Sequence, residues 1–383
     1  MKAVHQLLAS LSYGDAISNE ALVARGHLRR AGFRSEIFTY ECEARLRHEV
    51  RPLEAYEAEA TPDTVCLFHF SIGGPASRAA YHAPHRLAVL YHNITPASWF
   101  ATFHPHLARL CHDGRRELAA FASRAELGLA DSEYNRRELE QAGYAPTAVL
   151  PVVLDLESYR RVPPAPIVRK LYGADRRNIV FVGRIIPSKR IEDLLRAFAV
   201  FQRHVDRRSR LLIVGDYRGQ ERYFTRLVQM SAALKLRDVV FTGRVEDDER
   251  RAYYEAADVF LGLSEHEGFC VPLLEAMVYD VPVVAFDAGA VRETLGGAGV
   301  LLTHKSPELV AELLGRVLGD AALRASILRG QREAIARWKA MDFGALLLER
   351  LGPLLTENHK DTKTTKDTKD GSEGSHVAPK ISL

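Results

Sequence analysis

The chain has 383 residues, of which 47% are hydrophobic and 26% charged, with a net charge of +3. This length suits two globular domains, because single cores rarely grow beyond about 250–300 residues. The small net charge, and the lack of a basic tract interleaved with aromatic residues, argue against a nucleic-acid partner. No run of about 18 apolar residues occurs, so no membrane-spanning helix is expected.

Six short apolar runs in the first half predict β-strands, and a helix is expected from about Ile17 to Ala31, closed by Gly32. The second half repeats this pattern, with continuous apolar runs typical of strands buried on both faces of a parallel sheet. Alternating strands and helices predict an α/β fold with doubly wound parallel sheets. The predicted strands are residues 2–8, 35–40, 64–70, 86–93, 127–132, 147–153, 178–183, 210–215, 238–243, 258–264 and 281–287.

A segment with three prolines, many arginines and no clear periodicity separates the two groups of strands. We therefore predict two Rossmann-like domains facing a central cleft, residues 1–158 and 176–355, joined by a linker at 159–175. The last helix is a candidate to pack back on the first domain. Residues 356–383 are polar and repetitive and are predicted to be disordered.

The four cysteines, Cys42, Cys66, Cys111 and Cys270, are widely scattered and form no C-x-x-C pair. Neither a zinc site nor a disulfide framework is indicated, and a reducing cytoplasm is the expected compartment. The first fifteen residues also lack the features of a convincing signal peptide.

Ligands of doubly wound sheets bind beyond the carboxyl ends of the strands, which directs attention to the loops there. One strand ends at Gly183 and is followed by Arg184 and Lys189, just before a helix. These cations and the helix N-terminus suit a phosphate group. The alternative is a solvated basic turn.

The stretch "HEGFCVPLLEA" places Glu267 before a helix start and Glu275 within that helix. The free N–H groups from Gly268 to Val271 would bind an anion, and Glu275 could accept hydrogen bonds from the vicinal hydroxyls of a ribose. Glu267 could do the same for a second sugar. Favourable interaction with the helix dipole alone would explain Glu275 but not Glu267. Two phosphates and two polyols describe a nucleoside-diphosphate sugar.

These motifs resemble the retaining glycosyltransferases of family 4, which have the GT-B fold. The E-x7-E motif runs from Glu267 to Glu275, the Gly-Arg and downstream Lys are Gly183, Arg184 and Lys189, and the likeness covers about residues 175–345. It implies that the first domain binds the acceptor and the second binds the donor. It also implies retention of anomeric configuration, with Glu267 contacting the donor sugar.

The likeness in the first domain is weaker. It implies that Gly14 contacts a phosphate or sugar and that His92 contacts the sugar or transition state. The alternative for His92 is an ordinary loop histidine. His69 has the same two possible roles. The stretch "LADSEYN" resembles the "ADS" strand end of the family, and its serine is Ser132. The full set of expected site residues is Arg184, Lys189, Glu267 and His92 for catalysis, and Gly14, Gly183, Arg244, Val245, Gly268, Phe269, Cys270, Val271 and Glu275 for the donor.

Two features depart from the family pattern. Asp15 follows Gly14 where many members have a second glycine, and Cys270 stands where many have glycine. Because a cysteine beside a helix N-terminus tends toward a lowered pKa, we expect Cys270 to line the donor site and react with alkylators. The chain has no D-x-D motif, which favours catalysis without a metal, the cations taking its place. No cofactor is expected.

The sequence leaves several alternatives open. A nucleotide-sugar epimerase or a phosphorylase-like enzyme could share the architecture, and a noncatalytic sugar-nucleotide-binding partner subunit is a third. A dehydrogenase is disfavoured because no G-x-G-x-x-G follows a strand. The acceptor is expected to be a glycan or a lipid-linked sugar, as in polysaccharide synthesis. Residues 107–126, apolar with interspersed arginines, could contact a membrane surface or form an ordinary amphipathic helix.

Overall fold

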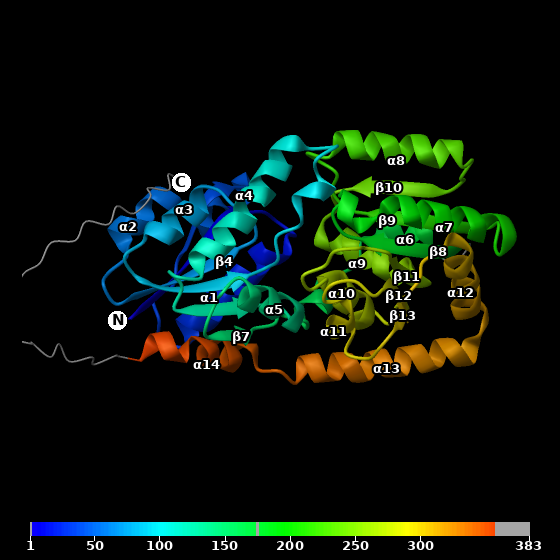
Figure 1. Cartoon of the computed structure of the whole chain (residues 1–383). Coiled ribbons are helices and arrows are strands. Elements are labelled where there is room, and N and C mark those ends of the chain that lie inside the picture. The colour runs from blue at the N-terminus through cyan, green and yellow to red at the C-terminus, as the bar shows by residue number, and fades with distance from the viewer. Residues whose placement is uncertain (1, 174–175, 357–383) are drawn as a thin grey trace, which may run out of the picture.

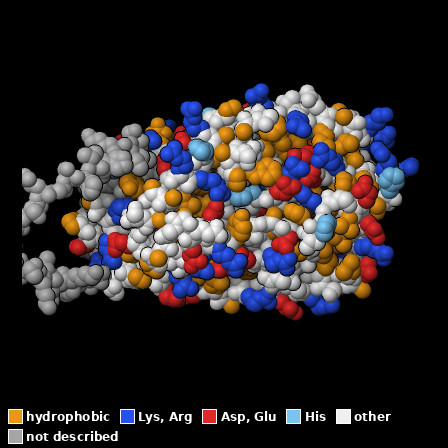
Figure 2. Space-filling view, in the orientation of Figure 1, with side chains coloured by type: hydrophobic (Ala, Val, Ile, Leu, Met, Phe, Trp, Pro, Cys, Tyr) orange, Lys and Arg blue, Asp and Glu red, His pale blue; other side chains and the backbone are white. Residues whose placement is uncertain are grey.

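The computed structural model describes residues 2–173 and 176–356, and they form two Rossmann-like domains placed end to end (Figure 1). The tail predicted to be disordered lies outside the described residues except for Thr356. Within the described ranges, no helix is long and apolar enough to cross a membrane. On the face drawn in Figure 2, acidic and basic side chains are interspersed, without a broad patch of one sign.

The N-terminal domain is built on a parallel sheet of seven strands in the order β3-β2-β1-β4-β5-β6-β7. Its strands are β1 (Ala3–Leu11), β2 (Ile37–Cys42), β3 (Arg51–Pro52), β4 (Thr64–Phe70), β5 (Arg86–Tyr91), β6 (Leu127–Ala130) and β7 (Thr147–Val149). Its helices are α1 (Ala16–Arg30), α2 (Tyr56–Glu59), α3 (Pro75–His82), α4 (Pro105–Phe121) and α5 (Glu133–Gln141).

The C-terminal domain has a parallel sheet of six strands in the order β10-β9-β8-β11-β12-β13. Its strands are β8 (Arg177–Val182), β9 (Ser209–Val214), β10 (Val239–Gly243), β11 (Val259–Gly262), β12 (Val283–Phe286) and β13 (Val300–Leu302). Its helices are α6 (Pro166–Tyr172), α7 (Ile191–His204), α8 (Glu221–Ala233), α9 (Asp247–Ala256), α10 (Val271–Val278), α11 (Val291–Leu295), α12 (Pro307–Gly319) and α13 (Ala321–Lys339).

The apolar strands form the cores because helices cover both faces of each sheet. All seven residues of β4 are buried, as a central parallel strand requires. Helix α7 buries Leu194, Leu195 and Phe198 along one stripe, at the spacing read from the sequence. These rigid layers fix where each strand ends, and therefore where the loops that follow it lie.

The chain crosses between the domains twice. Val152, Leu154 and Leu156 already pack in the core of the C-terminal domain, so the first crossing comes before the predicted linker at 159–175. That segment instead contains α6, whose Val168 is buried in the same core. The chain returns after α13, and α14 (Phe343–Leu355) packs on the N-terminal domain; α13 and α14 run along one side of the molecule (Figure 1).

Candidate functional site

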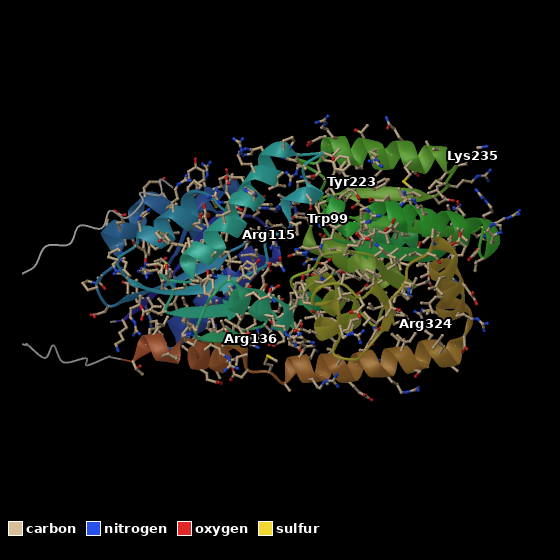
Figure 3. The ribbon with its side chains drawn as sticks, in the orientation of Figure 1. Trp99, Arg115, Arg136, Tyr223, Lys235 and Arg324 are labelled. Atoms are coloured by element: carbon tan, nitrogen blue, oxygen red, sulfur yellow. The ribbon has the colours of Figure 1, made fainter. Side chains whose placement is uncertain are left out.

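The carboxyl ends of the two sheets face each other, and loops from both domains are in direct contact there. Ser132 Oγ, after β6, donates a hydrogen bond of 2.9 Å to the carbonyl of Gly268, after β11. Phe103, on the segment between β5 and α4, places its ring centroid 5.1 Å from that of Tyr223 on α8. Tyr223 is labelled in Figure 3. The loops at the carboxyl ends of the two sheets therefore form the boundary at which the domains contact each other.

Lys189 and Glu267 form an ion pair at the centre of this region. Lys189 ends a short 3₁₀ turn after β8, and its Nζ lies 2.6 and 2.7 Å from the two carboxylate oxygens of Glu267. Glu267 is buried and Lys189 nearly so. Burial opposes the charge on Lys189, but the Glu267 carboxylate raises the pKa of the amine. Lys189 is therefore held as a fixed cation.

Arg184 is exposed on the loop that leads from β8 to this lysine. It follows Gly183, whose φ of +151° only glycine adopts readily. A Cβ at Gly215, after β9, would lie 1.8 Å from the carbonyl oxygen of Gly183. The two strand ends thus approach so closely that glycine is required, and the loop bearing Arg184 is held in place by this backbone contact.

Glu275 lies on the buried face of α10 and has different partners from Glu267. Tyr254 donates a hydrogen bond of 2.8 Å to its Oε2, and Arg250 Nε lies 3.5 Å from its Oε1. Since a carboxylate offers about four acceptor sites, Glu275 retains capacity for further hydroxyl donors. The two glutamates of the motif are therefore held by separate sets of side chains.

The residues that lead into α10 are packed tightly against the N-terminal domain. A Cβ on Gly268 would lie 2.9 Å from both the Cβ of Asn93 and the carbonyl oxygen of His92. The Phe269 ring points into the core and packs edge-on against Trp338, with ring centroids 5.5 Å apart, so only its backbone can meet a ligand. Val271 is the first residue of α10.

The expectation of a reactive Cys270 with a lowered pKa is wrong. Cys270 caps α10 with a left-handed φ of +77°, and it is half-buried, with its thiol next to Glu267. Burial and the Glu267 carboxylate both raise the pKa of this thiol well above its ordinary value. The prediction considered only the helix N-terminus, which favours the thiolate. Desolvation and the neighbouring carboxylate both disfavour the thiolate.

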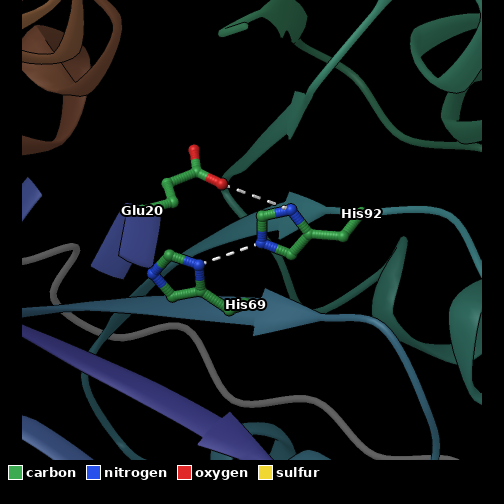
Figure 4. Close-up of side chains that lie close together, drawn as sticks. All are labelled: Glu20, His69 and His92. Atoms are coloured by element: carbon green, nitrogen blue, oxygen red, sulfur yellow. Dashed lines mark hydrogen bonds and ion pairs between the residues drawn. The ribbon is translucent and has the colours of Figure 1, made fainter. Parts of the chain in front are cut away.

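In the N-terminal domain, His92 belongs to a buried chain of hydrogen bonds (Figure 4). Its Nε2 lies 2.9 Å from Nδ1 of His69, and its Nδ1 lies 3.0 Å from Asp131 and 3.6 Å from Glu20. His69 Nε2 in turn lies 2.8 Å from Gln6 Oε1. Both ring nitrogens of His92 are thus occupied by protein groups, and only other parts of the residue remain for a ligand.

The same network carries strongly perturbed charges. Burial opposes charge on His92, but Asp131 and Glu20 raise its pKa to about 9. Burial raises the pKa of Glu20 to about 8 and also raises the pKa of Asp131. Candidate ligand atoms of Glu20, His69 and His92 lie within 4.8 Å of one another. Because the two rings are hydrogen-bonded directly to each other, this geometry is that of a proton-sharing chain.

The loop after β1 and the loop after β10, which carries the predicted donor residues Arg244 and Val245, also meet. Gly14 is exposed with a φ of +74°, and the next residue, Asp15, caps α1 by accepting a hydrogen bond from Ser18 N. Arg244, after β10, donates hydrogen bonds of 3.0 Å to the carbonyl of Tyr13 and 2.7 Å to Glu43. The side chain of Arg244 thus connects the domains, while Val245 packs half-buried against the C-terminal core.

A polar connection between the domains was not predicted from the sequence. His266 Nε2 lies 2.8 Å from Asn93 Oδ1, and Asn93 Nδ2 donates to Asn135 Oδ1 at the same distance. Asn93 has a φ of +68°, a conformation that asparagine tolerates better than most residues. Its position directly after the predicted site residue His92 was the one indication in the sequence that Asn93 lies near the site. Its partners could not be predicted, because they lie in distant parts of the sequence.

The family model and the named relatives that the chain resembles are all described as glycosyltransferases. Residues 169–333 match the model of the family "Glycosyl transferases group 1". Over 244 residues the chain is 32% identical to a D-inositol 3-phosphate glycosyltransferase of Frankia alni, covering 61% of this chain and 60% of that protein. It is 36% identical over 172 residues to a GDP-mannose-dependent alpha-mannosyltransferase of Mycolicibacterium smegmatis, covering 42% of each. The chain thus spans less than two thirds of the length of these relatives.

Solved structures match over most of the chain. Anabaena HepE in complex with UDP and glucose superposes with a TM-score of 0.72 at 21% identity, covering 92% of this chain and 100% of that one. Sucrose-phosphate synthase from Thermosynechococcus elongatus gives 0.70 at 18% identity, covering 93% and 99%. The chain therefore has the GT-B architecture, as the sequence predicted.

Proposed function

We propose that this protein is a retaining, metal-independent glycosyltransferase that moves a sugar from a nucleoside-diphosphate sugar to a glycan or lipid-linked acceptor. The observation that carries the proposal is the Lys189–Glu267 ion pair. Arg184 is exposed on the same loop as Lys189, and Glu267 lies on the loop that leads into α10. This combination supplies two cations and a helix end to one anion, next to a carboxylate that suits hydroxyl groups.

The roles follow from charge. Breaking the bond between the sugar and the diphosphate builds negative charge on the leaving group, and preorganised cations stabilise that charge. We assign this task to Arg184 and Lys189, with the N–H groups from Gly268 to Val271. Glu267 orients Lys189 and contacts the donor sugar, while Glu275 takes the ribose hydroxyls. Attack comes from the face of the leaving group, whose phosphate accepts the acceptor's proton.

The relatives suggest the substrates to test first. One is named for D-inositol 3-phosphate and another for GDP-mannose, and a structural neighbour binds UDP and glucose. We therefore propose a thermal-shift series of UDP, GDP and ADP in excess chelator, with and without Mg²⁺. A ligand at 100 times its dissociation constant adds about 2.7 kcal/mol of stability. A shift with one diphosphate that does not need Mg²⁺ supports the proposal, whereas no shift with any of them contradicts it.

A donor-turnover assay separates the alternatives. A transferase consumes donor faster when an acceptor is added, whereas an epimerase converts it without acceptor. A noncatalytic partner subunit binds diphosphate and turns nothing over. The intact set of Arg184, Lys189, Glu267 and Glu275 favours the transferase.

We place the enzyme in the cytoplasm, peripherally on the inner face of the membrane, in polysaccharide or glycoconjugate synthesis. Helix α4 is the candidate membrane contact, because it exposes the side chains of His106 and Arg109, while its residues Leu118 and Phe121 are buried. Co-sedimentation with liposomes tests this: binding that rises with anionic lipid supports it, and equal absence from neutral and anionic liposomes contradicts it.

A further inference from the structure

An open cavity of about 350 Å³ lies between the domains, beside the proposed centre. It is lined from the ends of β1 and β2 by Ser10, Ser12, Glu41, Cys42 and Glu43, and from the loops after β9 and β10 by Arg218 and Arg244. The thiol of Cys42 donates to the backbone carbonyl of Glu43. The loop with Arg218 is tied to the one with Arg184, because Ile185 N donates a hydrogen bond of 2.9 Å to the carbonyl of Asp216.

Both arginines of this cavity are already matched by carboxylates. Arg244 donates a hydrogen bond of 2.7 Å to Glu43. Arg218 donates from Nε to both carboxylate oxygens of Asp216, at 3.0 and 2.8 Å. The side chain of Arg45 adds a second cation to Glu43 and also binds Glu246. These pairs satisfy the strongest charges of the cavity within the protein.

Glu41 has no such partner. It is exposed near the end of β2, and no described cation is ion-paired with its carboxylate. In the sheet register, Glu41 is paired with Ser10 of β1, which places a carboxylate beside a hydroxyl at the cavity wall. The groups left for a ligand are therefore one carboxylate and the serine hydroxyls, and the uncommitted charge is negative.

We infer that this cavity is the acceptor subsite and that it takes an uncharged polyol, a sugar or cyclitol, rather than a phosphorylated one. The inference rests on the proposed function and extends it to the acceptor class. Glu41 accepts hydrogen bonds from two vicinal hydroxyls, and Ser10 and Ser12 exchange hydrogen bonds with others. A phosphate would meet the unpaired Glu41 and would have to displace Glu43 or Asp216 from the arginines.

Saturation-transfer NMR on the full chain tests this without needing turnover. The probes are myo-inositol and the methyl α-glycosides of glucose, mannose and galactose at 10 mM, each compared with its monophosphate, in the presence of the diphosphate that binds best, or of UDP when none binds. We expect at least one neutral probe to bind and its monophosphate to bind at least tenfold more weakly. Glu41→Gln should weaken the neutral probe at least tenfold and leave the melting temperature unchanged.

Glu54→Gln is the matched control, because Glu54 is an exposed carboxylate of the same domain outside the cavity; it should bind the probe as the unaltered protein does. The inference is overturned if a monophosphate binds as tightly as its neutral partner, if Glu41→Gln has no effect, or if no probe binds. Diphosphate binding and donor hydrolysis by water are measured alongside. If these persist, the glycosyltransferase proposal stands although the acceptor inference fails; if they are absent, the proposed function itself fails.

Discussion

The ammonium group of Lys189 is shared between both carboxylate oxygens of Glu267, at 2.6 and 2.7 Å. The two residues follow β8 and β11, which are neighbours in the sheet. Adjacent parallel strands thus bring together side chains that are 78 positions apart. The pair gives each residue a fixed position and charge, and several consequences can be measured.

Lys189→Ala should reduce kcat by about 10²–10³, comparable to the removal of other preorganised donors to a developing anion. Steady-state kinetics with saturating donor measure this. The variant should also be less stable by about 3–5 kcal/mol, because it leaves Glu267 buried without its partner.

Two further variants separate these effects. Lys170→Ala removes an exposed lysine on α6 and should change neither activity nor stability. Lys189→Ala combined with Glu267→Gln should recover part of the lost stability but none of the activity. Near-normal turnover of the single variant would contradict the assigned role.

Gly268→Ala should impede contact between the domains. The added Cβ would lie 2.9 Å from the backbone carbonyl of His92, which cannot move aside as a flexible side chain could. We expect kcat to fall at least tenfold while diphosphate affinity changes little, because most of the proposed donor contacts lie in the C-terminal domain. Small-angle scattering should show a larger radius of gyration.

Gly330→Ala provides the control for that substitution. Gly330 lies within α13 and a Cβ there meets nothing within 4 Å. Alanine at this helix position should raise stability by about 0.5–1 kcal/mol without affecting turnover. Equal turnover by the two alanine variants would rule out the contact at Gly268 as a requirement for catalysis.

Cys270 should react slowly with iodoacetamide at pH 7.5. Burial and Glu267 raise the pKa of its thiol, and only the thiolate is the nucleophile. Mass spectrometry of the alkylated peptides, in the folded protein and in the urea-unfolded chain, measures the rate at each cysteine. We expect slower labelling of Cys270 in the folded protein; faster labelling there would reinstate a thiolate stabilised by the helix.

Stability should fall as the pH rises from 6.5 to 9. The folded state raises the pKa of His92 from 6.5 to about 9 and that of Glu20 from 4.5 to about 8. Each contribution is full below the unfolded pKa and is lost as the pH rises through the folded pKa, because the folded state holds the proton longer.

Urea unfolding at a series of pH values measures this slope. Glu20→Gln retains a side-chain oxygen able to accept the hydrogen bond that Val153 N donates to Glu20, but it removes one titrating group and weakens the field on His92. The slope between pH 6.5 and 9 should therefore be shallower in the variant. A slope as steep as that of the unaltered protein would show that this network does not hold the extra protons.

Much of the fold could be predicted because its signals are local. Continuous apolar runs define most strands, and alternation with amphipathic helices defines the parallel sheets. The strands that were missed, β3 and β13, have two and three residues. Unlike the equally short β7, they are not continued by a longer apolar run. Helix α6 was missed because its seven residues lie in a segment rich in proline and arginine, where its buried side, at Val168, shows no periodicity.

The sequence by itself determined which loops carry the cations, the two glutamates and the glycines, because these residues lie at fixed offsets from strand ends that apolar patterning defines. Only the tertiary structure decided how they are paired and charged. Cys270 has a raised pKa, His92 has both ring nitrogens occupied, and Asn93 reaches His266. These properties depend on desolvation and on contacts between segments that are far apart in the sequence and are brought together by domain packing. No local sequence pattern indicates which of these segments will be in contact.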